Sequence, residues 1–169
     1  MDSLIQVLAQ ALDMIEMSCI GVTTNHGKRI AVLCAAMGQH LGLSGPELSD
    51  LAACALLHDN ALTEFLLMHE GREEDDPNLG VHCEIGQINA EIIPFNHSIA
   101  GFILYHHERA DGLGPFGLTE GYYPLGAELI AAADMIDAEL HLERISPEKL
   151  PLLRKKIEAE INSRFTKRA

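Results

Sequence analysis

Apolar residues recur at helical spacing along most of this chain, and this period constrains its fold more than any other feature. Leu4, Leu8 and Leu12 lie on one face of a first helix that ends near Gly21. The same spacing predicts six further helices, which cover residues 26–41, 45–57, 84–93, 98–107, 125–139 and 147–165. No alternating strand pattern of useful length is present. The sequence therefore predicts an all-α fold in a single domain that spans residues 1–169.

Polar and glycine-rich stretches mark where the predicted helices end. Ser44 followed by Pro46 and Glu47 is typical of a helix start, with Ser44 as the capping residue. Residues 70–80 are polar and contain proline and glycine, which predicts a solvated loop. Residues 110–123 hold four glycines, which predicts a second loop before the helix at 125–139.

The charge balance excludes some classes of protein. The chain has 169 residues, with 12 Lys and Arg against 25 Asp and Glu, a formal net charge of −13. Such an acidic chain lacks the basic stripes that bind a nucleic-acid duplex. Its longest apolar runs, such as Leu51–Leu57, are too short to span a membrane, and its first residues lack the basic start of a signal peptide. Four cysteines without a CxxC pair indicate reduced thiols, so we expect a cytoplasmic protein.

The nine histidines are the unusual part of the composition. A lone histidine in a helix is more often a packed or exposed residue than a ligand, and we assign that role to four of them: His40, His69, His97 and His141. The other five each lie beside a carboxylate, another histidine or a helix boundary: His26, His58, His82, His106 and His107.

Several of these polar residues end or interrupt apolar helices. His58 and Asp59 follow one apolar run, His106 and His107 follow another, and Asp134 interrupts an alanine-rich helix. One such residue alone is explained by a cap or an arginine partner, because a buried carboxylate is costly when unpaired. Several helices that all bring such groups to a buried end are explained more simply by a shared metal centre. Imidazole and carboxylate ligands suit divalent iron, manganese, zinc or nickel.

These residues resemble the HD-domain metal phosphohydrolases. The order His26, His58-Asp59 and Asp134 is similar to the ligand order of that family, and His82 with the segment HHERADGLG (106–114) resembles the HD-GYP subfamily, which hydrolyses cyclic di-GMP. The similarity runs from about residue 25 to residue 138, so the helix at 1–21 lies outside it and is expected to pack on the core. The resemblance implies an HD-type bundle of about six to eight helices.

The resemblance also implies a ligand set for two divalent transition metals. The counterparts of four residues bind one metal in the family: His26, His58, Asp59 and Asp134. The counterparts of His82, His106 and His107 bind the second, and the Asp59 counterpart bridges both and orients a hydroxide that attacks phosphorus. The implied substrate is a small nucleotide or another phosphoester.

The chain departs from the family pattern around the substrate. Leu62 replaces the lysine of the HDxGK motif, and Pro115 with Phe116 replaces the tyrosine and proline of GYP. Val22 stands where some members carry a glutamate that binds a third metal. The arginine-bearing segment that follows the Asp134 helix is missing, and Arg144 lies near its place but not at the matching offset.

Five further residues are candidates for supporting roles. Arg109 is a candidate contact to a substrate phosphate, although a salt bridge to Glu108 or to a loop acid explains it equally well. Asp137 and Glu108 are expected to support the ligands, whereas Asp111 and Gly112 are expected to shape the loop.

Three functions remain open from the sequence. The first is a two-metal phosphodiesterase of HD-GYP type. The second is a catalytically silent module that binds metal or nucleotide, and the third is a one-metal HD enzyme in which His82, His106 and His107 are structural. A homodimer or a separate sensory partner is compatible with each of them.

Overall fold

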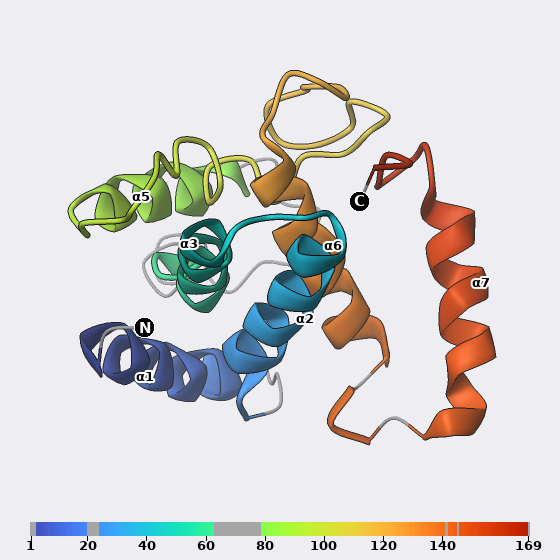
Figure 1. Cartoon of the computed structure of the whole chain (residues 1–169), viewed down its shortest axis with the longest axis horizontal. Helices are drawn as coiled ribbons and strands as arrows, with labels where there is room; N and C mark the ends of the chain where they lie inside the picture. The colour runs from blue at the N-terminus through green and yellow to red at the C-terminus, as the bar shows by residue number, and fades with distance from the viewer. Residues whose placement is uncertain (1–2, 20–23, 63–78, 141, 145, 169) are drawn as a thin grey trace.

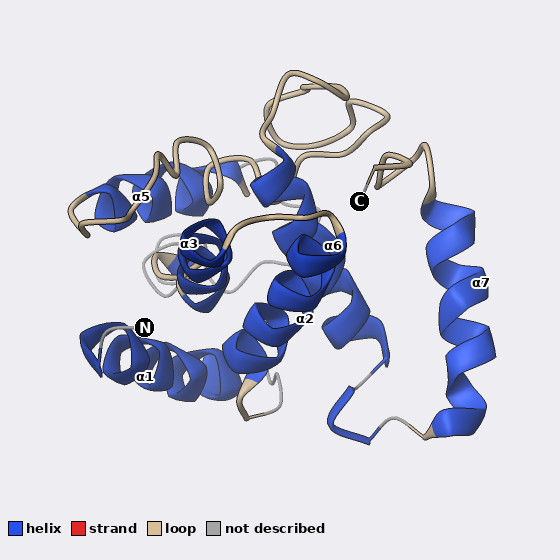
Figure 2. Ribbon diagram, in the orientation of Figure 1, coloured by secondary structure: helices blue, strands red, loops and turns tan. Residues whose placement is uncertain are grey.

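The computed structural model describes residues 3–19, 24–62, 79–140, 142–144 and 146–168. All helices and strands assigned within these ranges are helices (Figure 1, Figure 2). The α-helices are α1 (Ser3–Cys19), α2 (His26–His40), α3 (Gly45–Leu56), α5 (Gly80–Glu91), α6 (Leu125–Leu140) and α7 (Leu150–Glu160). Two short 3₁₀ helices follow α6, η1 (Leu142–Arg144) and η2 (Pro147–Lys149). The described residues contain no strand, apart from one isolated bridge between Ile161 and Phe165. The predicted all-α fold is confirmed.

Helix α2 lies at the centre of the helices and packs against both α3 and α6 (Figure 1). The core between them consists of aliphatic side chains with almost no exposure, such as Ile30 of α2, Leu51 of α3 and Leu129 of α6. Ile5 of α1 and Ala90 of α5 extend the same cluster. Burial of this apolar surface is the main force that holds the helix ends, and therefore the polar residues on them, in fixed positions.

Two helix starts are fixed by carboxylates. Ser44 begins α3 with the predicted cap, because its backbone N–H and hydroxyl both donate to the Glu47 carboxylate, at 2.8 and 2.6 Å. Helix α2 uses a carboxylate from another helix instead: Asp13 of α1 accepts from the backbone N–H groups of Asn25 and His26, at 2.6 and 2.7 Å. The acidic side chain at the N-terminus of α2 also complements the helix dipole. Asp13 therefore ties α1 to the start of α2.

The prediction of a helix at residues 98–107 is wrong. Residues 100–107 form consecutive turns, and Gly101 adopts a left-handed backbone with φ of 80° that an α-helix does not contain. The side-chain oxygen of Gln87 accepts from the N–H groups of Ile103 and Leu104, both at 3.2 Å, in place of helical carbonyls. A side chain from α5 thus replaces the backbone ladder, and a pattern of apolar residues alone does not reveal such a contact.

The helix predicted at 147–165 is shorter than expected. It divides into η2 and α7, and α7 ends at Glu160. Asn162 then adopts a left-handed backbone with φ of 68°, which turns the chain back toward α6. Most of the loop predicted at 70–80 lies outside the described residues. Within the described helices, none combines the length and apolar character that crossing a membrane requires.

Candidate metal centre

The structure brings all seven predicted ligand residues to one region, and most of them lie at helix ends. His26 is the first residue of α2, His58 and Asp59 lie in the turn after α3, and His82 lies in the first turn of α5. Asp134 is in the middle of α6. His106 and His107 end the run of turns before the glycine-rich loop. Helix packing therefore collects residues that are more than 100 positions apart in the sequence.

The first group of candidate ligands consists of His26, His58 and Asp134, whose donor atoms lie within 4.8 Å of one another. Asp134 Oδ1 is 3.2 Å from His26 Nε2 and 4.0 Å from His58 Nε2. Both imidazoles are almost fully buried. Two imidazole nitrogens and a carboxylate oxygen that converge at this spacing are a ligand set for a divalent metal.

The second group consists of His82, His106, His107 and Cys83, again with donor atoms within 4.8 Å of one another. The His82 and His106 rings pack edge to face, and their centroids are 5.3 Å apart. The ring centroids of His106 and His107 are 4.1 Å apart. Cys83 Sγ lies 3.6 Å from His82 Nε2. This group is dominated by imidazole, and it adds the buried thiol of Cys83.

Asp59 lies between the two groups. Its Oδ2 is 3.3 Å from His58 Nε2 of the first group, whereas its Oδ1 is 3.6 Å from His82 Nε2 and 3.5 Å from His106 Nε2 of the second. Each carboxylate oxygen therefore faces a different group. This is the geometry expected of a carboxylate that is shared by two cations.

The rings are oriented by hydrogen bonds on their other nitrogen. His58 Nδ1 donates to the Ala55 carbonyl at 2.9 Å, and His106 Nδ1 donates to the Ile103 carbonyl at 2.6 Å. A carbonyl only accepts, so these contacts place the proton on Nδ1 and leave Nε2 as the donor atom that faces the centre. Such outer contacts fix the tautomer of a metal-binding histidine.

His26 is oriented by a carboxylate rather than by a carbonyl. Its Nδ1 lies 2.7 Å from Asp137 Oδ2, and Asp137 is in turn bound by the guanidinium of Arg29, with Nη2 at 2.7 Å. Asp137 thus orients the His26 ring, and its role in supporting a metal ligand stays a prediction. Arg29 compensates the charge of Asp137, which is almost fully buried.

Burial and the neighbouring charges shift the pKa values of these groups. Burial lowers the pKa of His58 and lowers that of His82 to about 4, which favours the neutral form that binds metals. Burial also opposes the charge of Asp59, but the facing His58, His106 and His82 keep its pKa well below the usual range. For His26, the hydrogen bonds to Asp134 and Asp137 outweigh burial and raise the pKa to about 10.

Several buried polar atoms of the centre have no hydrogen-bond partner among the described residues. They are His58 Nε2, Asp59 Oδ1, His106 Nε2 and Oε2 of Glu16. A buried polar atom without a partner costs about 1–3 kcal/mol, so several that face one region are unfavourable unless another group satisfies them. Divalent cations would satisfy the nitrogen and carboxylate atoms together. The residues present therefore fit the metals that the resemblance implies.

The loop after His107 is closed by Glu108 and Asp111. The buried Glu108 carboxylate accepts from the backbone N–H groups of Phe116, at 2.7 Å, and of Leu118. A Cβ at Gly114 would lie 2.6 Å from Glu108 Cα, so only glycine fits there.

Asp111 accepts from the N–H of Leu113 at 3.0 Å and from the Arg109 guanidinium at 2.6 and 3.0 Å. Gly112 has a φ of 77°. Glu108, Asp111 and Gly112 therefore all contribute to the conformation of this loop, and a role for Glu108 in supporting the ligands stays a prediction.

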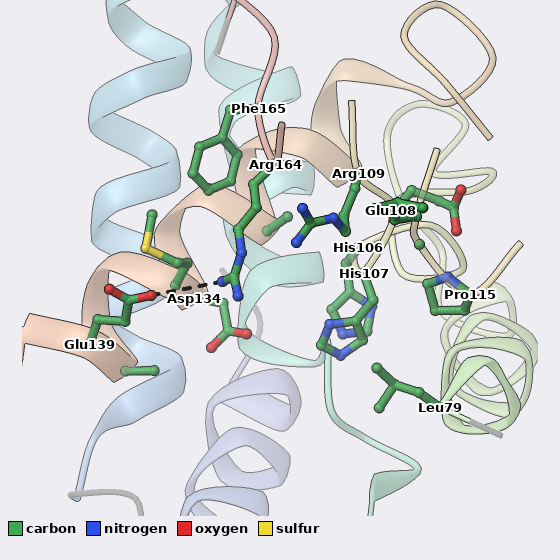
Figure 3. A pocket seen from close by; sticks show the side chains of 15 residues that line it. Leu79, His106, His107, Glu108, Arg109, Pro115, Asp134, Glu139, Arg164 and Phe165 are labelled. Atoms are coloured by element: carbon green, nitrogen blue, oxygen red, sulfur yellow. Dashed lines mark ion pairs between the residues drawn. The ribbon is translucent and has the colours of Figure 1, made fainter. Parts of the chain in front are cut away.

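A pocket of about 700 Å³ opens beside the candidate ligands (Figure 3). Its wall contains His106, His107 and Asp134 together with two arginines, Arg109 and Arg164. Figure 3 shows these arginines coming from two different chain segments, with the two histidines and Asp134 nearby. The volume is within the range of small-molecule sites.

Several known proteins are similar to this chain in sequence or in fold. No family model matches the chain. The chain is 33% identical over 132 residues to the cyclic di-GMP phosphodiesterase response regulator RpfG of Xanthomonas campestris pv. campestris. This alignment covers 71% of the chain and 34% of RpfG. The chain is 30% identical over 124 residues to the cyclic di-GMP phosphodiesterase PA4108 of Pseudomonas aeruginosa, covering 69% of the chain and 30% of the relative. A cyclic di-GMP phosphodiesterase of Thermotoga maritima is also 30% identical, over 127 residues, which are 69% of the chain and 34% of that relative.

Two solved structures share the fold. The crystal structure of a cyclic GMP-AMP-specific phosphodiesterase of V. cholerae, V-cGAP3, superposes with a TM-score of 0.72 at 22% identity, over 96% of this chain and 45% of that one. The HDG"Y"P protein Bd1817 of Bdellovibrio bacteriovorus superposes with a TM-score of 0.65 at 21% identity, over 97% of this chain and 59% of that one. In sequence and in fold, the chain resembles the HD-GYP-like branch of the HD-domain family. It spans about a third of the length of the curated relatives it matches.

The HD-GYP-like domain keeps the turn that presents His58 and Asp59, although its HDxGK motif is altered. Asn60 donates to the carbonyls of Leu57 and Gly86, at 2.8 and 2.9 Å, and so holds this turn against α5. Leu62, in the lysine position, is partly buried. Val22, in the position of the family glutamate, lies outside the described residues.

Two of the histidines predicted to be packed or exposed residues, His40 and His97, belong to neither group of candidate ligands. His97 binds Asp50 at 2.9 Å and is half exposed, and His40 is exposed at the end of α2. His69 and His141 lie outside the described residues.

Glu16 is the residue at this centre that the sequence reasoning missed. It lies on α1, outside the family resemblance, and is only 4% exposed. Burial, together with the charge of Asp59, raises its pKa to about 8, whereas His26 acts in the opposite direction. Its signal in the sequence is a lone acid within the apolar stripe of the first helix. The centre therefore includes a group from α1, a helix expected only to pack on the core.

Proposed function

We propose that this HD-GYP-like domain is a metal-dependent phosphodiesterase that hydrolyses a small nucleotide such as cyclic di-GMP. The observation that carries the proposal is the position of Asp59, one oxygen of which faces His58 and the other His82 and His106. The three curated relatives, all cyclic di-GMP phosphodiesterases, support the substrate class. We propose two divalent metals from iron, manganese, nickel and zinc.

His26, His58, Asp59 and Asp134 would hold one cation, and Asp59 with His82, His106 and His107 would hold the other. When bound, such cations lower the pKa of water and offset the negative charge of phosphoryl oxygens. The chain itself supplies orientation. The carbonyls of Ala55 and Ile103 and the carboxylate of Asp137 keep the imidazole nitrogens directed at the centre.

The pocket explains how a phosphodiester would reach the centre. His106, His107 and Asp134 belong to its wall, so a ligand in the pocket lies beside the candidate ligands. Its volume of about 700 Å³ exceeds what a single phosphate requires and leaves room for a nucleoside. The Glu108 contacts to Phe116 and Leu118 hold the loop that borders this side.

The test measures metal and turnover separately. The purified protein is analysed for bound metals, and hydrolysis of cyclic di-GMP and of cyclic GMP-AMP is followed by chromatography. About two equivalents of transition metal and hydrolysis of at least one of these nucleotides are expected. A protein that binds no transition metal would contradict the proposal.

The second candidate is a module that binds metal or nucleotide without turnover. Leu62 in place of the HDxGK lysine favours it, as do Pro115 and Phe116 in place of the GYP residues. Hydrolysis that disappears in Asp59→Asn would exclude this candidate. Two bound metals would exclude the one-metal enzyme. The formation of a homodimer and the existence of a separate sensory partner both stay predictions.

A further inference from the structure

Arg164 enters the pocket from a part of the chain that none of the family motifs includes. It follows α7 and lies in the wall of the same pocket as Asp134, His106 and His107 (Figure 3). Its side chain is 35% exposed and extends toward Glu139 of α6 (Figure 3). A cationic side chain thus stands beside the candidate metal centre, on the side from which a ligand would approach.

The backbone around Arg164 is held in place by several contacts. The N–H of Ala110 donates to the Arg164 carbonyl at 3.1 Å, and the N–H of Asp111 donates to the Ser163 carbonyl at 2.9 Å. Phe165 is 5% exposed and packs against α6. These contacts attach residues 163–165 both to the loop after His107 and to α6. The position of Arg164 is therefore fixed before a ligand binds, which reduces the entropic cost of binding.

The guanidinium of Arg164 is engaged only weakly within the described residues. Its two ion pairs, with Glu139 Oε1 and Glu160 Oε2, are both 3.9 Å long. Arg109, the other arginine of the wall, makes two short hydrogen bonds to Asp111, at 2.6 and 3.0 Å. Partly exposed ion pairs at such long distances contribute little, so Arg164 can exchange them for a better acceptor at small cost.

We infer that Arg164 binds a non-bridging phosphate oxygen of the substrate, and that Arg109 mainly holds its own loop through Asp111. The inference rests on the proposed function, because it takes the ligand of the pocket to be a phosphoester. A guanidinium binds phosphate through two parallel N–H groups, which gives a short, charge-assisted contact. Arg164 would in this way supply a cation to the substrate phosphate in a chain that has Leu62 in place of the HDxGK lysine.

The experiment measures binding of inorganic phosphate to the metal-loaded protein by calorimetry. Arg164→Gln is compared with Arg154→Gln, a matched control on α7 whose arginine side chain is 81% exposed and pairs with Glu158. We expect the Kd for phosphate to rise about tenfold or more in Arg164→Gln and to stay unchanged in Arg154→Gln. Metal content is expected to equal that of the unmodified protein in both variants.

A second variant tests the same contact in the opposite direction. Glu139→Gln removes the carboxylate that competes for Arg164, so phosphate binding is expected to tighten by about two- to threefold. If Arg164→Gln fails to fold, Glu139→Gln still tests whether Arg164 binds phosphate. Unchanged phosphate affinity in a folded Arg164→Gln, or no tightening in Glu139→Gln, would overturn the inference.

Failure of the inference and failure of the proposed function give different results. If the protein hydrolyses cyclic di-GMP while phosphate affinity is independent of Arg164, the inference is wrong and the proposed function stands. If phosphate binding depends on Arg164 but no phosphodiester is hydrolysed, the inference stands and the phosphodiesterase proposal is wrong.

Discussion

The two groups of candidate ligands are held in place in different ways. In the first group, His58 is oriented by the backbone carbonyl of Ala55, but His26 is oriented by the Asp137 side chain, which depends in turn on Arg29. In the second group, His106 is oriented by the backbone carbonyl of Ile103. A backbone contact survives most substitutions, whereas a chain of three side chains is broken when any one of them is replaced. The first group is therefore the part of the centre that remote substitutions can weaken.

The two groups also differ in charge. Asp134 contributes a carboxylate to the first group, and Asp137 and Glu16 lie close behind it. The candidate donors of the second group are three imidazoles and the Cys83 thiol, and Asp59 is the carboxylate that faces them. A cation is expected to gain more electrostatic stabilisation in the first group. Because one oxygen of Asp59 faces each group, we expect metal binding in one group to affect the other through Asp59.

Asp59→Asn is expected to have the largest effect, because it removes the carboxylate that both groups share. Hydrolysis of cyclic di-GMP should fall by roughly 10³-fold or more, the equivalent of about 4 kcal/mol. Elemental analysis should show loss of metal from both groups. Arg154→Gln on the exposed surface of α7 serves as a control that keeps every candidate ligand. Retention of two metals in Asp59→Asn would show that the groups are independent.

Substitution of a ligand that belongs to one group only should separate the two. Asp134→Asn is expected to release one equivalent of metal and His106→Gln the other, with activity reduced by about 100-fold or more in each. The remaining equivalent is measured by elemental analysis after dialysis. If either variant loses both metals, the two groups bind cooperatively and the distinction between them is only geometric.

Much of the centre could be predicted from the sequence, because its ligands leave local signals. His58 and Asp59 follow an apolar helix, and Asp134 interrupts an alanine-rich one, so each is unusual within its own window of sequence. Helix packing then brings them together without further information. The structure brings these side chains together, whereas their role as ligands stays a prediction. The all-α fold follows from the same helical period.

Contacts between distant segments could not be predicted in this way. The turns at 100–107 depend on Gln87 of α5, which supplies an acceptor that no helical pattern records. The sequence around Arg164 is typical of a solvated helical face, yet the left-handed Asn162 redirects the chain toward the pocket. Glu16 belongs to a helix that shares no motif with the family. In each case the decisive partner lies far away in the sequence.

Arg29→Gln tests whether the first group is the more sensitive to remote change. The variant removes the cation that holds Asp137, so His26 loses its fixed orientation. Metal affinity of the first group is expected to fall by about 10- to 100-fold, with the second group unaffected. Competition with a chromophoric chelator measures both affinities. Arg154→Gln is the matched control, and equal losses in both groups would contradict the comparison.

Cys83→Ala tests whether the thiol of the second group is a ligand, and it should have the smallest effect. Cys83 is fully buried, and its Sγ lies 3.7 Å from the Leu79 carbonyl, a contact that suits a protonated thiol. His82, His106 and His107 with Asp59 already complete the second group. We therefore expect both metals to be retained and stability to urea to fall by about 1 kcal/mol, the cost of a small cavity. Loss of one equivalent of metal, as in His106→Gln, would instead make Cys83 a ligand and the second group the softer of the two.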